Sequence, residues 1–172
     1  GSMSRQVVQY HPVIGHLFMP SLKTRVAHEG GGYLFQSNAQ GFRSGHEFQR
    51  ERTPGLRRVL VFGDSFTAGD GVSNSQRYTE RLEELLPATE VYNFGLSGSG
   101  TDQQYLAWRA CARDIEADRV VIAIQPENIR RNASAFRLNM DPGGEQAYYP
   151  KPYCTLEAGR LVWHHQPVPE GT

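Results

Sequence analysis

The 172-residue sequence lacks any hydrophobic run approaching the roughly 20 residues that a membrane-spanning helix requires. It also lacks an excess of charge, because 18 basic side chains balance 18 acidic ones. A neutral chain gives no electrostatic reason to expect nucleic acid as its main partner. We therefore predict no membrane span and no nucleic-acid partner. No signal peptide is visible, so the compartment stays open, and so does the oligomeric state.

Cysteine is scarce, and Cys111 and Cys154 have neither metal-site spacing nor the pattern of a disulfide framework. We expect two ordinary thiols, with a single bridge as the alternative. The six histidines are scattered, and none has the i, i+4 partner typical of a zinc-binding helix. The phosphate-binding patterns G-K-[ST] and G-x-G-x-x-G are missing as well. These absences predict a protein without a metal or another cofactor.

The residues that are present suffice for one folded domain, since 38% are hydrophobic and 21% are charged. Residues 1–57 hold turn formers and short strand-like pieces without a long periodic pattern. We predict that this segment is an irregular lead-in with one or two short edge strands, packed on the core. Residues 58–172 are expected to form an α/β core.

Three segments of this core have the length of strands, and the first and third are continuous apolar runs, which are typical of strands buried on both faces of a parallel sheet. They are Val59–Phe62, Glu90–Phe94 and Arg119–Ile124. The segments between them, 73–86 and 101–115, have apolar residues at helical spacing. This order predicts a three-layer, doubly wound (flavodoxin-like) α/β fold. Sheets of this type usually have about five strands, so we expect the sheet to be incomplete at the C-terminus.

The tail of the sequence is less regular. The segments Cys154–Leu156 and Arg160–Trp163 flank Glu157-Ala158-Gly159, which predicts a hairpin with a three-residue loop. The last histidines, His164 and His165, stand at its end, just before a proline-rich stop. We expect them to be solvated or to pack against neighbours, with a catalytic role as the less favoured alternative.

Glycine-rich or polar segments follow each predicted strand at its carboxyl end. They are Gly63–Gly71, Asn93–Gln103 and Gln125–Asn128. In open α/β sheets, ligands bind in the crevice beyond the carboxyl ends of the strands. We therefore expect these three loops to meet and to form the functional site.

The first loop, Gly63-Asp64-Ser65-Phe66-Thr67, resembles the first sequence block of the SGNH (GDSL-like) hydrolases. The segment 93–98 resembles their second block, and Glu127-Asn128-Ile129 resembles their third. The resemblance implies that Ser65 is the nucleophile, that the Gly98 amide helps form an oxyanion hole, and that the Asn128 side chain supplies another donor. On an alternative alignment of the third block, Asn128 is displaced and that donor is absent.

Other parts of the chain resemble a subgroup of the same family, so the resemblance covers most of the sequence. The segments are His11–Gly15, Asn38–Arg43, Lys151–Tyr153 and Pro167–Pro169. The resemblance implies a serine hydrolase that acts on carboxylic esters with small acyl or acetyl groups and needs no cofactor. Attack by a serine hydroxyl requires a base, and the negative charge that develops on the carbonyl oxygen requires fixed donors.

One part of the family pattern is missing. The family carries a late D-x-x-H segment, which supplies the histidine base and its aspartate, and this sequence contains no D-x-x-H. The resemblance therefore implies that the His and Asp of the triad are not in this chain. Either the chain is truncated, which is the favoured explanation, or the base comes from elsewhere, or the domain is not catalytic.

Simpler interpretations stay open for the same residues. Ser65 is also suited to capping a helix, Asn128 to capping a loop, and the glycines to ordinary turns. Asp64 is expected to hold its loop by hydrogen bonds and not to act as a base. At the level of function, the alternative is a non-catalytic module that binds a carbohydrate or an acyl group. A nucleotide-binding role ranks below both.

Overall fold

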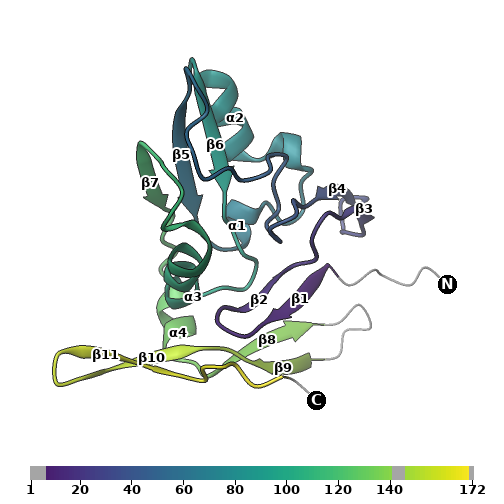
Figure 1. The fold of residues 1–172 in the computed structure, drawn as a ribbon. Helices are drawn as coiled ribbons and strands as arrows, with labels where there is room; N and C mark the ends of the chain where they lie inside the picture. Colours follow the sequence, from purple (N-terminus) through teal and green to yellow (C-terminus); the bar gives the residue numbers. More distant parts are fainter. Residues whose placement is uncertain (1–6, 141–145, 171–172) are drawn as a thin grey trace.

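The computed structural model describes residues 7–140 and 146–170 and shows a mixed α/β fold (Figure 1). Its centre is a parallel sheet of three strands in the order β6-β5-β7. The strands are β5 (Arg57–Phe62), β6 (Thr89–Asn93) and β7 (Arg119–Ile122). The predicted parallel arrangement of three strands is confirmed, and each strand overlaps the segment predicted for it.

Short helices connect these strands. They are α1 (Ser65–Ala68) and α2 (Tyr78–Leu85) before β6, α3 (Thr101–Ala107) before β7, and α4 (Asn128–Asn132) after it. The helix predicted over 73–86 is broken into a 3-10 turn, Asn74–Gln76, and α2, because Arg77 has extended backbone. The Arg77 guanidinium is buried and donates to the Arg43 carbonyl. A tertiary contact therefore replaces the helical continuation that the local pattern favours.

Eight further strands in the described part of the chain form antiparallel hairpins of consecutive strands. They are β1 (Val8–His11), β2 (Gly15–Phe18), β3 (Lys23–Val26), β4 (Tyr33–Gln36), β8 (Phe136–Met140), β9 (Gln146–Pro150), β10 (Tyr153–Glu157) and β11 (Arg160–His164). The predicted hairpin near the end of the chain is β10–β11, but its loop has two residues, since Glu157 pairs with Arg160. Ala158 and Gly159 both have positive φ, as tight hairpin turns require.

The lead-in packs against one face of the sheet and shares its core. Phe94, which follows β6, lies 4.8 Å from Phe42 of the lead-in and 4.7 Å from Phe62 of β5, measured between ring centroids. The opposite face is smaller, with Val59, Val61 and Val91 packed under Leu82 of α2. The remaining buried apolar residues of the larger core are Ile14, Leu17, Phe18, Phe35, Leu60, Ala68, Tyr92, Leu96, Leu106, Ala107 and Ala112.

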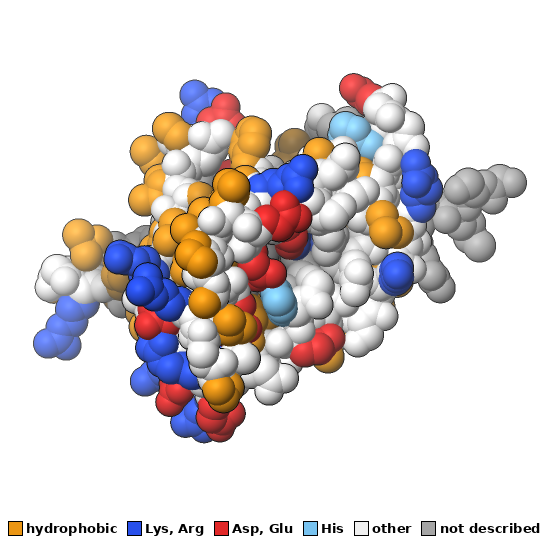
Figure 2. Space-filling model, turned by 90° about the horizontal axis from the view of Figure 1, so that it is seen from above, with side chains coloured by type: hydrophobic (Ala, Val, Ile, Leu, Met, Phe, Trp, Pro, Cys, Tyr) orange, Lys and Arg blue, Asp and Glu red, His pale blue; other side chains and the backbone are white. Residues whose placement is uncertain are grey.

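The prediction that the third strand is buried is wrong. Val120, Val121 and Ile122 of β7 expose 50%, 43% and 50% of their surfaces, and Ile124 exposes 68%. β7 is an edge strand, and β5 is the strand it pairs with among the described residues. Figure 2 shows hydrophobic side chains gathered on the half of the molecule that holds this sheet, whereas few are visible on the half that holds β3 and β4. An apolar strand thus lies open on both faces.

Candidate functional site

The three loops at the carboxyl ends of the strands are held together by Arg131, a residue that sequence reasoning did not single out. Its Nη1 lies 3.6 Å from Asp64 Oδ2, after β5. The same nitrogen donates to the Ser99 carbonyl at 3.0 Å, after β6, and to Asn128 Oδ1 at 3.1 Å, after β7. One guanidinium therefore contacts a residue beside Ser65, a residue beside Gly98, and Asn128 itself.

Ser65 is the first residue of α1 and is half-buried. The helix cap is its neighbour Asp64, whose Oδ1 accepts from the Phe66 N–H at 3.0 Å. The interpretation of Ser65 as a capping serine is therefore wrong, and the expectation that Asp64 holds the loop is confirmed. Asp64 is 2% exposed, with Arg131 as its counter-charge. The Ser65 hydroxyl has no hydrogen bond to any residue in the described part of the chain.

The second loop is held in place by the residues that precede Gly98. Asn93 donates from Nδ2 to the Thr67 carbonyl at 2.8 Å and accepts on Oδ1 from the Gly95 N–H at 2.8 Å. A Cβ added to Gly95 would collide with the backbone at Ala68, so a glycine is needed where this loop crosses α1. Gly98 has φ +74°, a left-handed conformation that also favours glycine.

Asn128 is fully buried at the start of α4. Its Oδ1 accepts from Arg131, which orients the side-chain amide, and its Nδ2 has no hydrogen-bond partner among the described residues. Buried polar groups are nearly always paired, so an unpaired amide nitrogen calls for an explanation. A capping role does not provide one, because the donor side of the amide is unused.

Two backbone N–H groups in the described part of the chain also lack a hydrogen-bond acceptor. Within residues 7–140 and 146–170, neither the Ser65 N–H nor the Gly98 N–H donates to a protein acceptor. Together with Asn128 Nδ2, the three loops thus present three donors without acceptors. The structure brings these loops together through Arg131, but no hydrogen bond in the described part joins Ser65, Gly98 and Asn128 directly.

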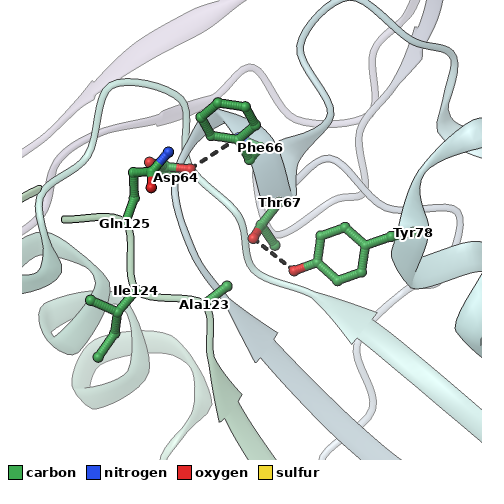
Figure 3. Close-up of a pocket in the computed structure, with 7 residues that line it drawn as sticks. All are labelled: Asp64, Phe66, Thr67, Tyr78, Ala123, Ile124 and Gln125. Atoms are coloured by element: carbon green, nitrogen blue, oxygen red, sulfur yellow. Dashed lines mark hydrogen bonds between the residues drawn. The ribbon is translucent and has the colours of Figure 1, made fainter. Parts of the chain in front are cut away.

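A solvent-open pocket lies near this site but does not include it (Figure 3). Asp64, Phe66 and Thr67 contribute from the first loop and α1, and Tyr78 hydrogen-bonds Thr67 across it at 2.8 Å. The other wall is the segment 123–125, which follows β7. Since Ser65, Gly98 and Asn128 do not line it, the pocket belongs to the uncovered side of the sheet beside β7.

Two buried ionisable side chains support the second loop. Their contacts were not predicted from the sequence. His16 of β2 is 3% exposed and donates from Nε2 to the Ser97 carbonyl at 2.7 Å. Lys151, after β9, is 2% exposed and donates from Nζ to Asp102 Oδ2 at 2.6 Å. Asp102 lies in the first turn of α3, directly after this loop. No local sequence pattern predicts these contacts, because Ser97 lies 81 residues from His16 and Asp102 lies 49 residues from Lys151.

His16 should make the protein sensitive to acid. Burial, with a smaller contribution from the Arg137 charge, lowers the pKa of His16 from 6.5 to about 3. The folded state therefore keeps His16 neutral while the unfolded chain protonates near pH 6.5, so stability is full above that pH and falls as the pH drops toward 3. We expect the free energy of unfolding to fall by about 2–3 kcal/mol between pH 7 and pH 4.5 on account of this residue.

Urea unfolding at both pH values measures this loss, with His16→Gln as the control. The variant lacks the titrating group and should lose less stability on acidification than the wild type. An equal loss in the two proteins would contradict the assignment to His16.

The two histidines near the end of the chain are hydrogen-bonded elsewhere. His165 Nδ1 lies 3.0 Å from the Lys151 carbonyl, and His164 lies 2.8 Å from the Thr155 hydroxyl on the same hairpin. No group of three or more His, Cys, Asp or Glu in the described ranges is arranged to hold a metal. Cys111 and Cys154 are free thiols, and burial raises the pKa of Cys111 to about 11, which keeps it protonated.

No helix in the part of the chain that the structure describes is long and apolar enough to cross a membrane. Comparison with known proteins adds no family assignment, because neither a family model nor a curated protein matches this sequence. The functional interpretation therefore depends on the residues and contacts described above.

Proposed function

We propose that this chain carries the nucleophile and the oxyanion-binding loops of a carboxylic ester hydrolase of the SGNH (GDSL-like) type. The proposed substrates are esters of small acyl or acetyl groups. The observation that carries the proposal is a set of three donors that have no acceptor among the described residues: the Ser65 N–H, the Gly98 N–H and Asn128 Nδ2. An oxyanion hole needs such pre-positioned donors, left unpaired until charge develops on the substrate.

In the proposed reaction, the Ser65 oxygen attacks the ester carbonyl carbon while a base takes the hydroxyl proton. The carbonyl oxygen becomes an oxyanion and accepts hydrogen bonds from the three donors. Collapse of this intermediate breaks the bond to the alcohol, which leaves with the proton returned by the base. Water then attacks the acyl-serine in the same way and releases the carboxylic acid and free Ser65.

We place the base and its orienting carboxylate on polypeptide that covers β7. No histidine among the described residues hydrogen-bonds the Ser65 hydroxyl, and the chain contains no D-x-x-H. The exposed apolar side chains of β7, and the open pocket beside it, supply a surface for such a cover. A covered β7 would complete the three-layer, doubly wound sheet that the order of strands and helices favours.

One observation favours a second candidate function, a non-catalytic module that binds a carbohydrate or an acyl group. The same three donors are suited to holding a carbonyl or hydroxyl oxygen without any chemistry, and no base lies at hand in the described residues. The two candidates share the loops and differ only in whether Ser65 is reactive.

Reaction with a fluorophosphonate tests the proposal. We expect the protein, expressed at its natural length, to form an adduct that peptide mass spectrometry maps to Ser65, and Ser65→Ala to remain unlabelled. Ser97→Ala is the matched control, because Ser97 directly precedes Gly98 in the second loop but donates its hydroxyl to Asp70; it should label normally. Absence of any adduct, with unchanged folding, would favour the binding module and reject the hydrolase.

A further inference from the structure

Arg137 of β8 lies against Gly98. A Cβ built on Gly98 would be 3.2 Å from Arg137 Cδ and 3.5 Å from its Nη1. The guanidinium carbon is also 5.7 Å from the ring centroid of Tyr149 on β9. Figure 1 shows the β8–β9 hairpin at the end of the molecule toward which β5 and β6 point, the same end that holds the three loops. The side chain thus reaches from this hairpin onto the loop that carries a proposed oxyanion donor.

The charge of Arg137 has no counter-charge in the described part of the chain. The described carboxylates beside the loop already have partners: Asp64 pairs with Arg131, Asp102 with Lys151, and Asp70 accepts from the Ser97 hydroxyl at 2.5 Å. No ion pair to Arg137 forms among the described residues. The side chain is half-buried, and burial lowers its pKa from the ordinary value. Holding a cation partly out of water without a counter-charge is unfavourable, and such groups cluster at functional sites.

We infer that Arg137 is a specificity-determining residue and that the substrate carries a carboxylate close to its ester group. This inference rests on the proposed function, because it places the carboxylate relative to Ser65 and Gly98. The planar guanidinium binds a carboxylate with two parallel hydrogen bonds, which fixes both position and orientation. A carboxylate bound there would supply the counter-charge that the described chain does not provide.

Kinetics with a matched pair of esters tests the inference in the protein at its natural length. The anionic probe is 4-nitrophenyl hemisuccinate, and the neutral one is 4-nitrophenyl butyrate, which has an acyl chain of the same length. We expect Arg137→Gln to lower kcat/KM for the hemisuccinate by about 10- to 100-fold, the usual worth of a charged hydrogen bond, and to leave the butyrate nearly unchanged. Arg137→Lys keeps the charge but loses the paired N–H donors of the guanidinium. Its kcat/KM for the hemisuccinate should lie between those of the wild type and Arg137→Gln.

Arg130→Gln is the control for a general change of charge. Arg130 lies on α4 and is exposed, so its removal should alter both esters by no more than about twofold. If Arg137→Gln and Arg137→Lys slow both esters equally, the inference fails while Ser65-dependent hydrolysis still supports the proposed function.

Calorimetric titration with succinate tests the carboxylate site independently of the proposed hydrolase activity. We expect wild-type protein to bind succinate and Arg137→Gln to bind it about 10- to 100-fold more weakly, whether or not Ser65 is reactive. If Ser65 resists the fluorophosphonate while succinate binding depends on Arg137, the hydrolase fails and the carboxylate site stands. Equal binding by both proteins, or no binding, overturns the carboxylate site.

Discussion

Replacing Asn128 with alanine is expected to lower kcat for a neutral ester by about 100- to 1,000-fold, the usual effect of removing one oxyanion donor. The reason is that Asn128 Nδ2 is buried and has no partner among the described residues, so in the proposed reaction it would gain a hydrogen bond only when the substrate oxygen becomes negative. An interaction made only in the transition state changes kcat and leaves KM nearly constant. Steady-state kinetics with 4-nitrophenyl butyrate, on the protein at its natural length, measures both parameters.

Asn128→Asp separates the donor from the structural role of this side chain. Aspartate keeps an oxygen toward Arg131, as Asn128 Oδ1 does now, but loses the amide hydrogens. We expect kcat to fall at least as far as in the alanine variant, because the new carboxylate also repels the oxyanion. Urea unfolding of both variants is the control for folding. Wild-type kcat in either variant would remove Asn128 from the proposed oxyanion hole.

The parallel sheet was predictable because three strand-like segments, two of them continuous apolar runs, alternate with segments of helical spacing. Burial of the third run was not predictable, since composition reports how hydrophobic Val120–Ile122 are and not whether another element covers them. The lead-in has four strands of four residues each, too short to establish an alternation against the turn residues around them. Phe35 and Phe42 of the lead-in share a core cluster with residues of the sheet, and contacts between segments so distant in sequence leave no local pattern.

The candidate site was predictable as a set of loops and not as a set of contacts. The rule that parallel strands end at one edge predicted that the segments around Ser65, Gly98 and Asn128 approach one another. The group that connects them, Arg131, looks like any exposed helical arginine in the sequence. His16 gave no signal either, because a single buried histidine is recognised only by its distant partner.

The buried Lys151–Asp102 pair should contribute most to stability among the contacts that support the second loop. Lys151→Met keeps the aliphatic stem but leaves Asp102 buried without its counter-charge, which is expected to cost about 3–5 kcal/mol of unfolding free energy. Urea denaturation measures this loss. The exposed pair Arg81–Glu84, whose side chains are 64% and 60% exposed, provides the matched comparison. Arg81→Met should cost less than about 1 kcal/mol, because water screens that pair.

A double-mutant cycle distinguishes the ion pair from the packing of the lysine stem. Asp102→Asn neutralises the carboxylate at nearly constant volume, so the combined variant with Lys151→Met should lose less stability than the two single variants added together. Purely additive losses would show that Lys151 acts instead through the hydrogen bonds that its Nζ donates to the carbonyls of Ser134 and Pro152.

Because Asp102 lies in the first turn of α3 directly after Gly98–Gly100, loss of the ion pair should also loosen that loop. Hydrogen exchange should therefore rise at Gly98 more than at Val61 in the centre of the sheet.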